Sequence, residues 1–491
     1  MKQTGKMKKI MFQSVAAIMA CTTIGSLAAC GSTPPPVVGG GHSGSGVVFE
    51  IPEGGYDGSK QTVNFYHTMG SNLRDELDKA IVEFNKLYPN ITIEHEQVGN
   101  YDDVRNRIST ELTVGNHPSI AYCYPDHVAL YNMYKAVITL DNIMDSTISV
   151  TNTAGTEVLG YTQAQKDDFI EAYLNEGKAY GDDMMYTLPL SKSTELLYYD
   201  KDFFTEHNLT VPTTWDEMEA VCAQIKTIDP ESIPLGYDSE ANWFITMCEQ
   251  QGSPYTSSDP ANRFLFDNEA NYGFVGRFAE WYEKGYLTTS ELYGQYTSNL
   301  FKNVGGQRAY MCIGSSAGAT HQRPGKDAEG NYLFDVGITS IPQLNPENPK
   351  VISQGPSICI FNDSNKQEVL ASWLFAKFLT TDVIFQSDFA NASGYVPVIK
   401  SVENDPIYAE DLAKANGGDY IAQLAIKTCL EQKDAYYVSP AFNGSSVARD
   451  QVGLLMQECL VDAAHNADKK ADMNYISRKF AEYVDKCIYL A

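Results

Sequence analysis

Strand-like and helix-like segments alternate along residues 62–124, and this alternation constrains the fold more than any other feature of the sequence. Residues 62–66 alternate apolar and polar side chains as a strand does, and residues 73–87 then carry an apolar stripe at helical spacing. The strand pattern returns at residues 91–94 and 119–124, with a second helical stripe between them. Strands separated by single helices lie parallel and are joined by right-handed crossovers. The sequence therefore predicts an α/β lobe.

A second lobe is predicted from the strand-like residues 195–199 onward. Thr214 and Glu217 form a capping-box sequence that predicts the start of a helix. Further helical patterns recur at the following stretches: 271–284, 366–379 (opened by Ser364 and Gln367) and 448–463. The chain has 491 residues, which is more than one hydrophobic core ordinarily holds, so two or more lobes are expected.

The N-terminal segment has the layout of a cleaved secretion signal. Four lysines lie within the first nine residues, and an apolar run at residues 10–20 follows that is too short for a stable membrane span. Leu-Ala-Ala-Cys-Gly, ending in Cys30 and Gly31, resembles the bacterial lipobox, in which the cysteine thiol is diacylglycerylated. We therefore expect residues 1–29 to be a lipoprotein signal peptide and Cys30 to anchor the protein on the outside of the cell membrane. A rival lipobox ends at Cys21, and an unlipidated secreted protein is the third alternative.

Composition defines the tether and excludes one class of partner. Residues 31–60 are rich in Gly, Ser and Pro, so residues 30–60 are predicted to be the lipidated cysteine followed by a flexible tether. The net charge of the whole chain is −26, and cleavage of the signal would remove four lysines and no acidic residue. So acidic a surface repels nucleic acid, which is not expected as a partner.

The cysteines predict buried thiols rather than a metal site. Eight of them follow Cys30, and they are scattered singly, without a C-x-x-C pair or a histidine at ligand spacing. Single cysteines inside apolar segments are typical of small buried side chains. One or two disulfides stay open as an alternative, since the protein is expected outside the membrane. Neither a metal nor another cofactor is predicted.

The segment at residues 188–204 reads Leu-Pro-Leu-Ser-Lys-Ser-Thr-Glu-Leu-Leu-Tyr-Tyr-Asp-Lys-Asp-Phe-Phe and continues into Val-Pro-Thr-Thr-Trp-Asp-Glu. This segment and three others resemble extracellular solute-binding protein family 1, the sugar-binding receptors of ABC importers. Asp200 stands where members of the family usually carry Asn. The other three segments follow the order of the family: residues 84–91, 305–311 and 393–398.

The resemblance implies an α/β fold of the two-lobed periplasmic-binding-protein type II, with the ligand in a cleft between lobes joined by hinge crossings. The first lobe is expected to comprise residues 61–190 and 358–395, and the second lobe residues 191–357 and 396–491. Residues 145–168 are polar and longer than expected for the family, and we interpret them as an inserted surface loop.

The implied function is capture without catalysis. A monomeric receptor of this family binds a small-molecule carbohydrate, either a mono- or an oligosaccharide, and delivers it to ABC permease subunits in the membrane. Two alternatives stay open: a receptor for glycerol 3-phosphate or a glycerophosphodiester, and a surface polysaccharide adhesin on the same fold. An esterase is disfavoured because the G-x-S-x-G sequence at residues 314–318 is followed too soon by Pro324 and Gly325, which interrupt the helix that such a nucleophile needs. A glycosidase has no specific support, since any acidic chain offers carboxylate pairs.

A sugar presents a weakly apolar C–H face and a rim of hydroxyls, so its receptor needs flat aromatic walls and planar polar side chains. Open α/β sheets bind ligands at the carboxyl ends of their strands, and several candidates lie at such ends or in polar loops. The expected ligand-binding residues are Tyr66, His67, Tyr124, Asp126, Trp243, Ser315, Ser316, Tyr395 and Arg449. Trp243 and Tyr395 are candidates because the family often places ligand contacts at those points. Each has a structural role as its alternative, and for Arg449 that alternative is a surface salt bridge. Trp215, Trp281 and Trp373 are predicted to be core residues.

Overall fold

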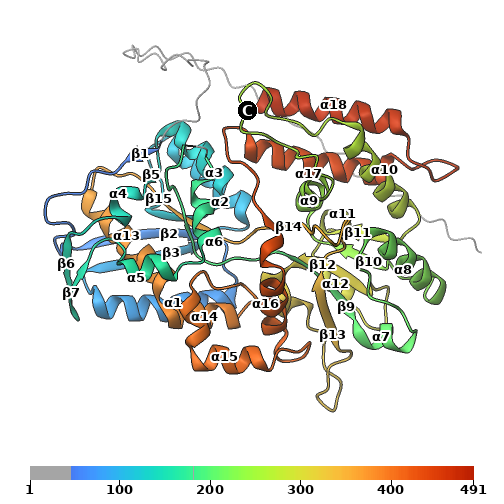
Figure 1. Ribbon diagram of the computed structural model, residues 1–491, viewed down its shortest axis with the longest axis horizontal. Coiled ribbons are helices and arrows are strands. Elements are labelled where there is room, and N and C mark those ends of the chain that lie inside the picture. The colour runs from blue at the N-terminus through green and yellow to red at the C-terminus, as the bar shows by residue number, and fades with distance from the viewer. Residues whose placement is uncertain (1–45, 181) are drawn as a thin grey trace, which may run out of the picture. The chain divides into compact units, whose positions relative to one another are not determined.

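The computed structural model describes residues 46–180 and 182–491 (Figure 1). Cys30, the rival Cys21, the predicted signal peptide and the first half of the predicted tether lie outside the described residues. No helix within the described ranges is both long enough and apolar enough to cross a membrane.

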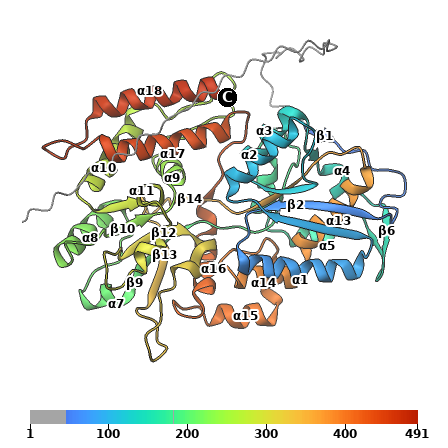
Figure 2. The ribbon, with the colours of Figure 1, turned by 180° about the vertical axis from the view of Figure 1, so that it is seen from behind.

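Two five-stranded mixed sheets organise the described chain, one in each lobe (Figures 1 and 2). The first sheet has the order β3-β2-β4-β15-β8, with bounds β2 Gln61–His67, β3 Ile91–Gln97, β4 Ile120–Cys123, β8 Leu188–Pro189 and β15 Ser357–Ile360. As expected, β2 is parallel to both β3 and β4. The later strand β15 is antiparallel to β4 and to β8, which makes the sheet mixed.

The second sheet has the order β11-β10-β12-β9-β13, with bounds β9 Glu195–Asp200, β10 Leu235–Tyr237, β11 Leu287–Thr289, β12 Met311–Ser315 and β13 Val336–Ser340. In it β10 is parallel to β11 and β12, whereas β9 is antiparallel to its neighbours β12 and β13. The short strands outside the two sheets are β1 Val47–Val48, β5 Ile138–Thr139, β6 Ser149–Asn152, β7 Gly155–Val158, β14 Val351–Ile352 and β16 Tyr436–Tyr437. The two-lobed α/β class that the sequence predicts is confirmed.

Helices cover both sheets (Figure 2). Those in contact with the first sheet include α1 Ser71–Leu87, α2 Tyr101–Leu112, α3 Pro125–Tyr131 and α13 Lys366–Thr381. On the second lobe, α17 packs against α9, α10 and α18. The longer helices of this lobe are α8 Trp215–Ile228, α9 Glu240–Gln250, α10 Glu269–Glu283, α17 Ser445–Asp462 and α18 Met473–Leu490. The other helices are α4 Asp141–Met144, α5 Gln163–Asp168, α6 Glu171–Asn175, α7 Lys201–Glu206, α11 Ser290–Tyr293, α12 Ser298–Phe301, α14 Val383–Asn391, α15 Pro406–Ala413 and α16 Ile421–Glu431.

The helix starts show how far local sequence determines local structure. Thr214 caps α8, and its hydroxyl and the Glu217 side chain each accept the other residue's backbone N–H, as the capping-box sequence predicts. The start of α13 differs by one residue from the prediction. Asn365, rather than Ser364, accepts the N–H of Glu368, because an asparagine next to the first helical turn serves as a cap at least as well as a serine.

The core residues are largely those that the sequence predicts. Trp215, Trp281 and Trp373 are buried, and Trp281 and Trp373 are fully so. All eight cysteines of the described residues are free and buried, in agreement with the prediction of small apolar thiols. One cluster of buried apolar side chains includes Val63 of the first sheet and Tyr198 of the second, so apolar packing continues from lobe to lobe.

Three chain segments run side by side where the lobes join. Lys192 pairs with Val396, and Ser193 pairs with Gln354, through backbone hydrogen bonds of 2.7–3.0 Å. These pairs bring together the segment between β8 and β9, the segment before β15 and the segment after Tyr395. The residue boundaries assigned to the two lobes stay a prediction.

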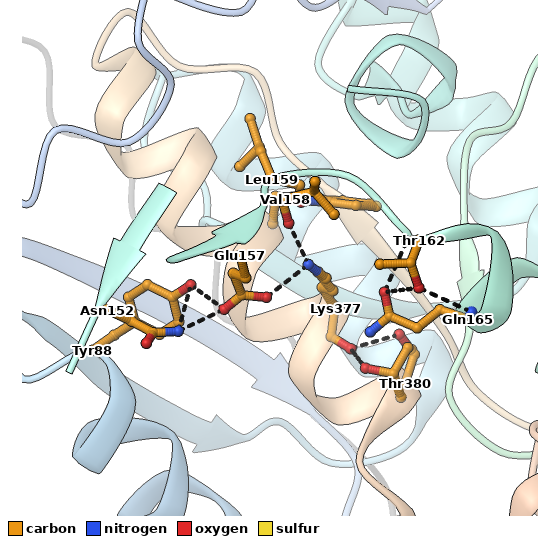
Figure 3. Close-up of polar contacts among 11 residues, drawn as sticks. Tyr88, Asn152, Glu157, Val158, Leu159, Thr162, Gln165, Lys377 and Thr380 are labelled. Carbon is orange, nitrogen blue, oxygen red and sulfur yellow. Dashed lines mark hydrogen bonds and ion pairs between the residues drawn. The ribbon is translucent and has the colours of Figure 1, made fainter. Parts of the chain in front are cut away.

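Residues 145–168 form an ordered substructure, and the interpretation as a polar surface loop is wrong. They fold into the β6–β7 hairpin and α5, and their apolar side chains Val150, Leu159 and Tyr161 enter the buried cluster of the first lobe. Figure 3 shows Lys377 of α13 reaching the hairpin, where its ammonium group donates to Glu157 at 2.9 Å and to the Val158 carbonyl at 2.7 Å. The polar average composition of this segment conceals the buried apolar side chains Val150, Leu159 and Tyr161, which is why the sequence did not predict the hairpin.

Candidate ligand-binding cleft

A cavity of about 540 Å³ lies between the two lobes. A second cavity of about 550 Å³ adjoins it and shares five lining residues with it: Tyr101, Tyr124, Asp238, Ser239 and Asn242. A smaller cavity of about 60 Å³ also reaches Tyr124. We call these three connected spaces the cleft. A concave space with apolar walls and a few convergent polar groups is the usual form of a small-molecule site.

Three tyrosines of the first lobe form what we call the aromatic wall: Tyr101, Tyr124 and Tyr395. The rings of Tyr101 and Tyr124 are stacked, with centroids 4.3 Å apart and planes 19° apart. Tyr101 is the first residue of α2, after a capping box made by Asn100, and Tyr124 is the N-cap residue of α3 directly after β4. Both rings therefore project from the carboxyl ends of strands, where such sheets bind ligands.

Four residues of the second lobe form what we call the polar wall: Glu195, Asp238, Asn242 and Arg449. Arg449 near the start of α17 donates from its guanidinium group to the side-chain oxygen of Asn242. Glu195 on β9 accepts a hydrogen bond of 2.5 Å from the Tyr237 hydroxyl and faces the side-chain amide of Asn242. Hydrogen bonds therefore orient one side chain at each end of the polar wall: Asn242 accepts from Arg449, and Glu195 accepts from Tyr237.

The titrating groups of the cleft are shifted mainly by burial. Burial raises the pKa of Glu195 to about 7, although the hydrogen bond from Tyr237 and the nearby Asn242 amide oppose the shift. Burial also raises the pKa of Asp238, which accepts from the backbone N–H and the hydroxyl of Thr297 at 2.7 Å each. On the cationic side, burial lowers the pKa of Lys302 and of His321. Arg449 is the cation of the cleft that keeps its charge most firmly, because a guanidinium does not deprotonate in proteins.

Five residues expected from the sequence line the cleft. Tyr124, Ser315 and Tyr395 line the 540 Å³ cavity, Arg449 lines the adjoining one, and Asp126 lines the smallest. The structure brings these residues together from four separate parts of the chain. Direct contact of each with a ligand stays a prediction.

Trp243 is a correction to the sequence analysis. Its side chain is 0% exposed and packs inside the second lobe, where its ring is stacked on Tyr237 at 4.6 Å and contacts Phe278 at 4.2 Å. The preceding residue, Asn242, is the one that lines the cleft. Neighbouring residues of a helix point about 100° apart, so when Asn242 lines the cleft, Trp243 is directed into the core. Trp243 supports Tyr237, and Tyr237 in turn donates to Glu195.

Tyr66 and His67 are also corrections, because neither lines any of the three cavities. His67 is fully buried, and its Nδ1 accepts the N–H of Met69 at 3.1 Å. Its Nε2 must then carry the proton and donate to His95 Nδ1 at 2.9 Å. Burial, and then His95, lower the pKa of His67 to about 3, so the ring is neutral. Tyr66 accepts at 2.8 Å from Arg107, whose guanidinium group covers its ring.

Ser316 is the third correction. It is fully buried, whereas its neighbour Ser315 lines the cavity. A short 3₁₀ helix, Ser316–Gln322, follows β12 where a serine hydrolase requires a long α-helix after its nucleophile. A buried serine without that helix does not support the esterase alternative.

Sequence reasoning missed Tyr101, Glu195, Asp238 and Asn242. Tyr101 follows the end of β3, so the rule that selected Tyr124 was sufficient to find it. Asp238 and Asn242 lie in the polar stretch of residues 236–242 that directly precedes the candidate Trp243. Glu195 begins a buried strand, and no signal in the sequence marks a carboxylate there as a cleft residue.

Comparison with known proteins places these observations in a family. The sequence profile of a family described as bacterial extracellular solute-binding protein matches residues 79–416. Among curated proteins, the sn-glycerol-3-phosphate-binding periplasmic protein UgpB of Salmonella typhimurium is 22% identical over 370 residues. The match covers 73% of this chain and 78% of that protein.

Solved structures share the fold at low sequence identity. UgpB from Mycobacterium tuberculosis, solved in complex with glycerophosphocholine, superposes with a TM-score of 0.67 at 15% identity, over 88% of this chain and 100% of that one. The substrate-binding protein Lmo0181 from Listeria monocytogenes, in complex with cycloalternan, superposes with a TM-score of 0.67 at 14% identity, over 87% and 99%. At such identities the likeness establishes the two-lobed fold and leaves the ligand open.

Proposed function

This chain belongs to the family of bacterial extracellular solute-binding proteins, and on that premise we propose that it is the carbohydrate receptor of an ABC importer. The observation that carries this proposal is the pairing of an aromatic wall with a polar wall across a cavity of about 540 Å³. Stacked tyrosines offer flat surface to the C–H face of a sugar ring, and carboxylate and amide groups accept from and donate to its hydroxyls.

The proposed mechanism is capture by closure of the two lobes. The aromatic wall belongs to the first lobe and the polar wall to the second, so a ligand bound to both walls favours the closed arrangement over the open one. The paired chain segments at Lys192 and Ser193 are suited to act as the hinge, because only the few segments that cross between the lobes there must change conformation when the lobes close. The closed receptor then presents the ligand to a membrane permease, and no bond is made or broken.

A receptor for glycerol 3-phosphate or a glycerophosphodiester is the second candidate, and Arg449 is the observation that favours it. Within the described part of the chain, Arg449 makes no direct ion pair with a carboxylate, and its hydrogen bond goes to the Asn242 amide. A guanidinium group in a cleft suits a phosphate, which it can bind through two parallel hydrogen bonds. Against this candidate, Glu195 and Asp238 add carboxylates to the same wall.

A thermal-shift screen tests the ligand class. The purified protein is heated with mono- and oligosaccharides in one set and with glycerol phosphates and their diesters in the other. A ligand at a hundred times its dissociation constant adds about 2.7 kcal/mol to the free energy of unfolding. Stabilisation by sugars alone supports the proposal, stabilisation by phosphates alone supports the second candidate, and a lack of any stabilisation favours an adhesin.

The anchor is part of the proposal and rests on the sequence. With a lipid on Cys30, the tether would hold a monomeric receptor at the outer face of the cell membrane, since two or three acyl chains anchor stably. Cys30→Ser is expected to release the protein or to leave its precursor uncleaved, while Cys21→Ser keeps the lipid. Mass spectrometry of the mature N-terminus checks both, and an unmodified N-terminal residue other than Cys30 refutes the anchor.

A further inference from the structure

An ion pair joins the two lobes beside the adjoining cavity of about 550 Å³, which Asp450 lines. Arg105 belongs to α2 of the first lobe, and Asp450 belongs to α17 of the second (Figures 1 and 2). Nη1 of Arg105 donates to Oδ1 of Asp450 at 3.2 Å, and Nη2 lies 3.0 Å from Oδ2. Two parallel hydrogen bonds between a guanidinium group and a carboxylate are strong and also fix the orientation of the pair. The contact therefore exists only while α2 and α17 are close to each other.

Arg105 has a second acidic neighbour, and this one belongs to its own helix. Asp102, one turn earlier on α2, places its Oδ1 3.3 Å from Nη1 of Arg105. The Arg105 side chain is only 9% exposed, and a buried charge that loses its partner destabilises a protein strongly. When the lobes separate, Asp102 can keep Arg105 paired. The contact with Asp450 can therefore open without leaving the cation unpaired.

A neighbouring contact connects the ion pair to the ligand-binding cleft. Arg449, which directly precedes Asp450, places its guanidinium group 5.5 Å from the ring centroid of Tyr124 in the aromatic wall. Asp126 on α3 supplies a further carboxylate near both arginines, and it belongs to the first lobe, as Arg105 does. Consecutive residues of α17 therefore reach the first lobe, one at the aromatic wall and the other at α2.

We propose that Arg105 and Asp450 are positioning residues for ligand capture: their ion pair holds the lobes in the closed arrangement, and Asp102 competes for Arg105 and so favours opening. This inference rests on the lobe closure of the proposed function, whichever ligand the cleft takes. A ligand that contacts both walls and the ion pair favour the same arrangement, so each strengthens the effect of the other. The ion pair thereby sets how readily a captured ligand is released.

The separation of the lobes without any ligand is the direct test. Small-angle X-ray scattering of the full receptor measures its radius of gyration, which increases when the lobes separate. Asp450→Asn is expected to raise the ratio of open to closed receptor at least about fivefold, the lower end of usual couplings between sites, and so to enlarge this radius. Asp102→Asn is the matched control, because it removes the other carboxylate beside Arg105. Its radius is expected to be smaller than that of the wild type.

Salt provides a second readout, which a role in packing alone would not change. Raising the NaCl concentration from 0.1 M to 1 M shortens the screening length from about 10 Å to about 3 Å. The radius of the wild type is therefore expected to approach that of Asp450→Asn, whereas the radius of Asp450→Asn should change little. Thermal melts establish that each variant is folded, and the wild-type measurement needs no substitution.

The outcomes distinguish this inference from the proposed function. An Asp450→Asn variant with the radius of the wild type overturns the inference, as does an Asp102→Asn variant that opens as far as Asp450→Asn. A wild-type radius that is independent of salt overturns it as well. Stabilisation by sugars in the thermal-shift screen, together with any of these results, leaves the proposed function standing. Conversely, opening of Asp450→Asn without any sugar ligand in the screen supports the role of the ion pair and removes the carbohydrate assignment.

Discussion

The two walls of the cleft are supported in different ways. The tyrosines of the aromatic wall lie at or beyond the ends of secondary structure elements, and Tyr101 and Tyr124 stack on each other. The polar wall depends on the interior of the second lobe, since Glu195 is oriented by Tyr237, and Tyr237 is stacked on the buried Trp243. The difference implies that a change in the aromatic wall removes ligand contact alone, whereas a change behind the polar wall affects folding and recognition together.

The sharpest test of this comparison is Trp243→Ala. Loss of a fully buried indole is expected to lower the free energy of unfolding by roughly 3–5 kcal/mol, the range for large aromatic residues in cores. Ligand affinity should fall as well, because Tyr237 loses the ring on which it is stacked. Urea denaturation followed by calorimetry measures both quantities, and Trp243→Phe serves as a milder control. Normal stability with lost binding would instead make Trp243 a ligand contact.

Glu195→Gln tests how the second lobe supports the polar wall, through the dependence of protein stability on pH. The pKa of Glu195 is about 7 in the folded protein and near the ordinary value of about 4.3 when unfolded. Because the pKa of Glu195 is higher in the folded protein than in the unfolded chain, its carboxyl group stabilises the fold fully at pH values below the pKa of the unfolded chain. This stabilisation is lost as the pH rises to about 7. The variant is therefore expected to be more stable than the wild type at pH 8, by roughly 1–3 kcal/mol, and to show little difference at pH 4.

Urea midpoints recorded at both pH values check this prediction, with Asp238→Asn as the matched loss of a cleft carboxylate. If Glu195→Gln is less stable than the wild type at pH 8, the carboxylate is ionised in the folded protein at little cost. The orientation of the polar-wall residues would then not depend on the packing of the second-lobe core behind them.

The aromatic wall is tested by Tyr124→Ala. Removal of the ring is expected to weaken ligand binding by roughly 1–3 kcal/mol, the scale of aromatic contacts at binding sites. Stability should change little, since Tyr124 is only partly buried. Calorimetry with the best sugar from the screen gives the affinity, and Tyr124→Phe, which keeps the ring, should bind nearly as well. A stability loss as large as that of Trp243→Ala would mean that the two walls are supported alike.

The smallest effect is expected for Arg449→Ala with a neutral sugar, under roughly 1.5 kcal/mol, because a neutral ligand loses one hydrogen bond among several. The affinity of the wild type should also change little with salt, as exposed charges are screened over roughly 10 Å at 0.1 M ionic strength. Titrations at two salt concentrations check this. Tight binding of glycerol 3-phosphate that Arg449→Ala abolishes would reverse the order of the two candidate ligands.

Much of the fold could be predicted, because local sequence patterns determine where its strands and helices form. The alternation along residues 62–124 predicted the parallel strands β2, β3 and β4, and the capping box at Thr214 predicted the start of α8. The hairpin in residues 145–168 could not be predicted, because it is held by Lys377 and Trp373, which lie more than two hundred residues further along the chain. Contacts at such separation leave no periodic signal.

The sequence by itself determined the two-lobed α/β class, the family and the part of the site that lies at strand ends, such as Tyr124. Only the tertiary structure decided that Asn242 faces the cleft while Trp243 is buried, and that Arg449 donates to Asn242 while Glu195 accepts from Tyr237. The physical reason is that periodicity states which side chains share a face of an element. Which face meets the other lobe is settled by how the elements pack, and that packing is the joint result of contacts spread over the whole chain.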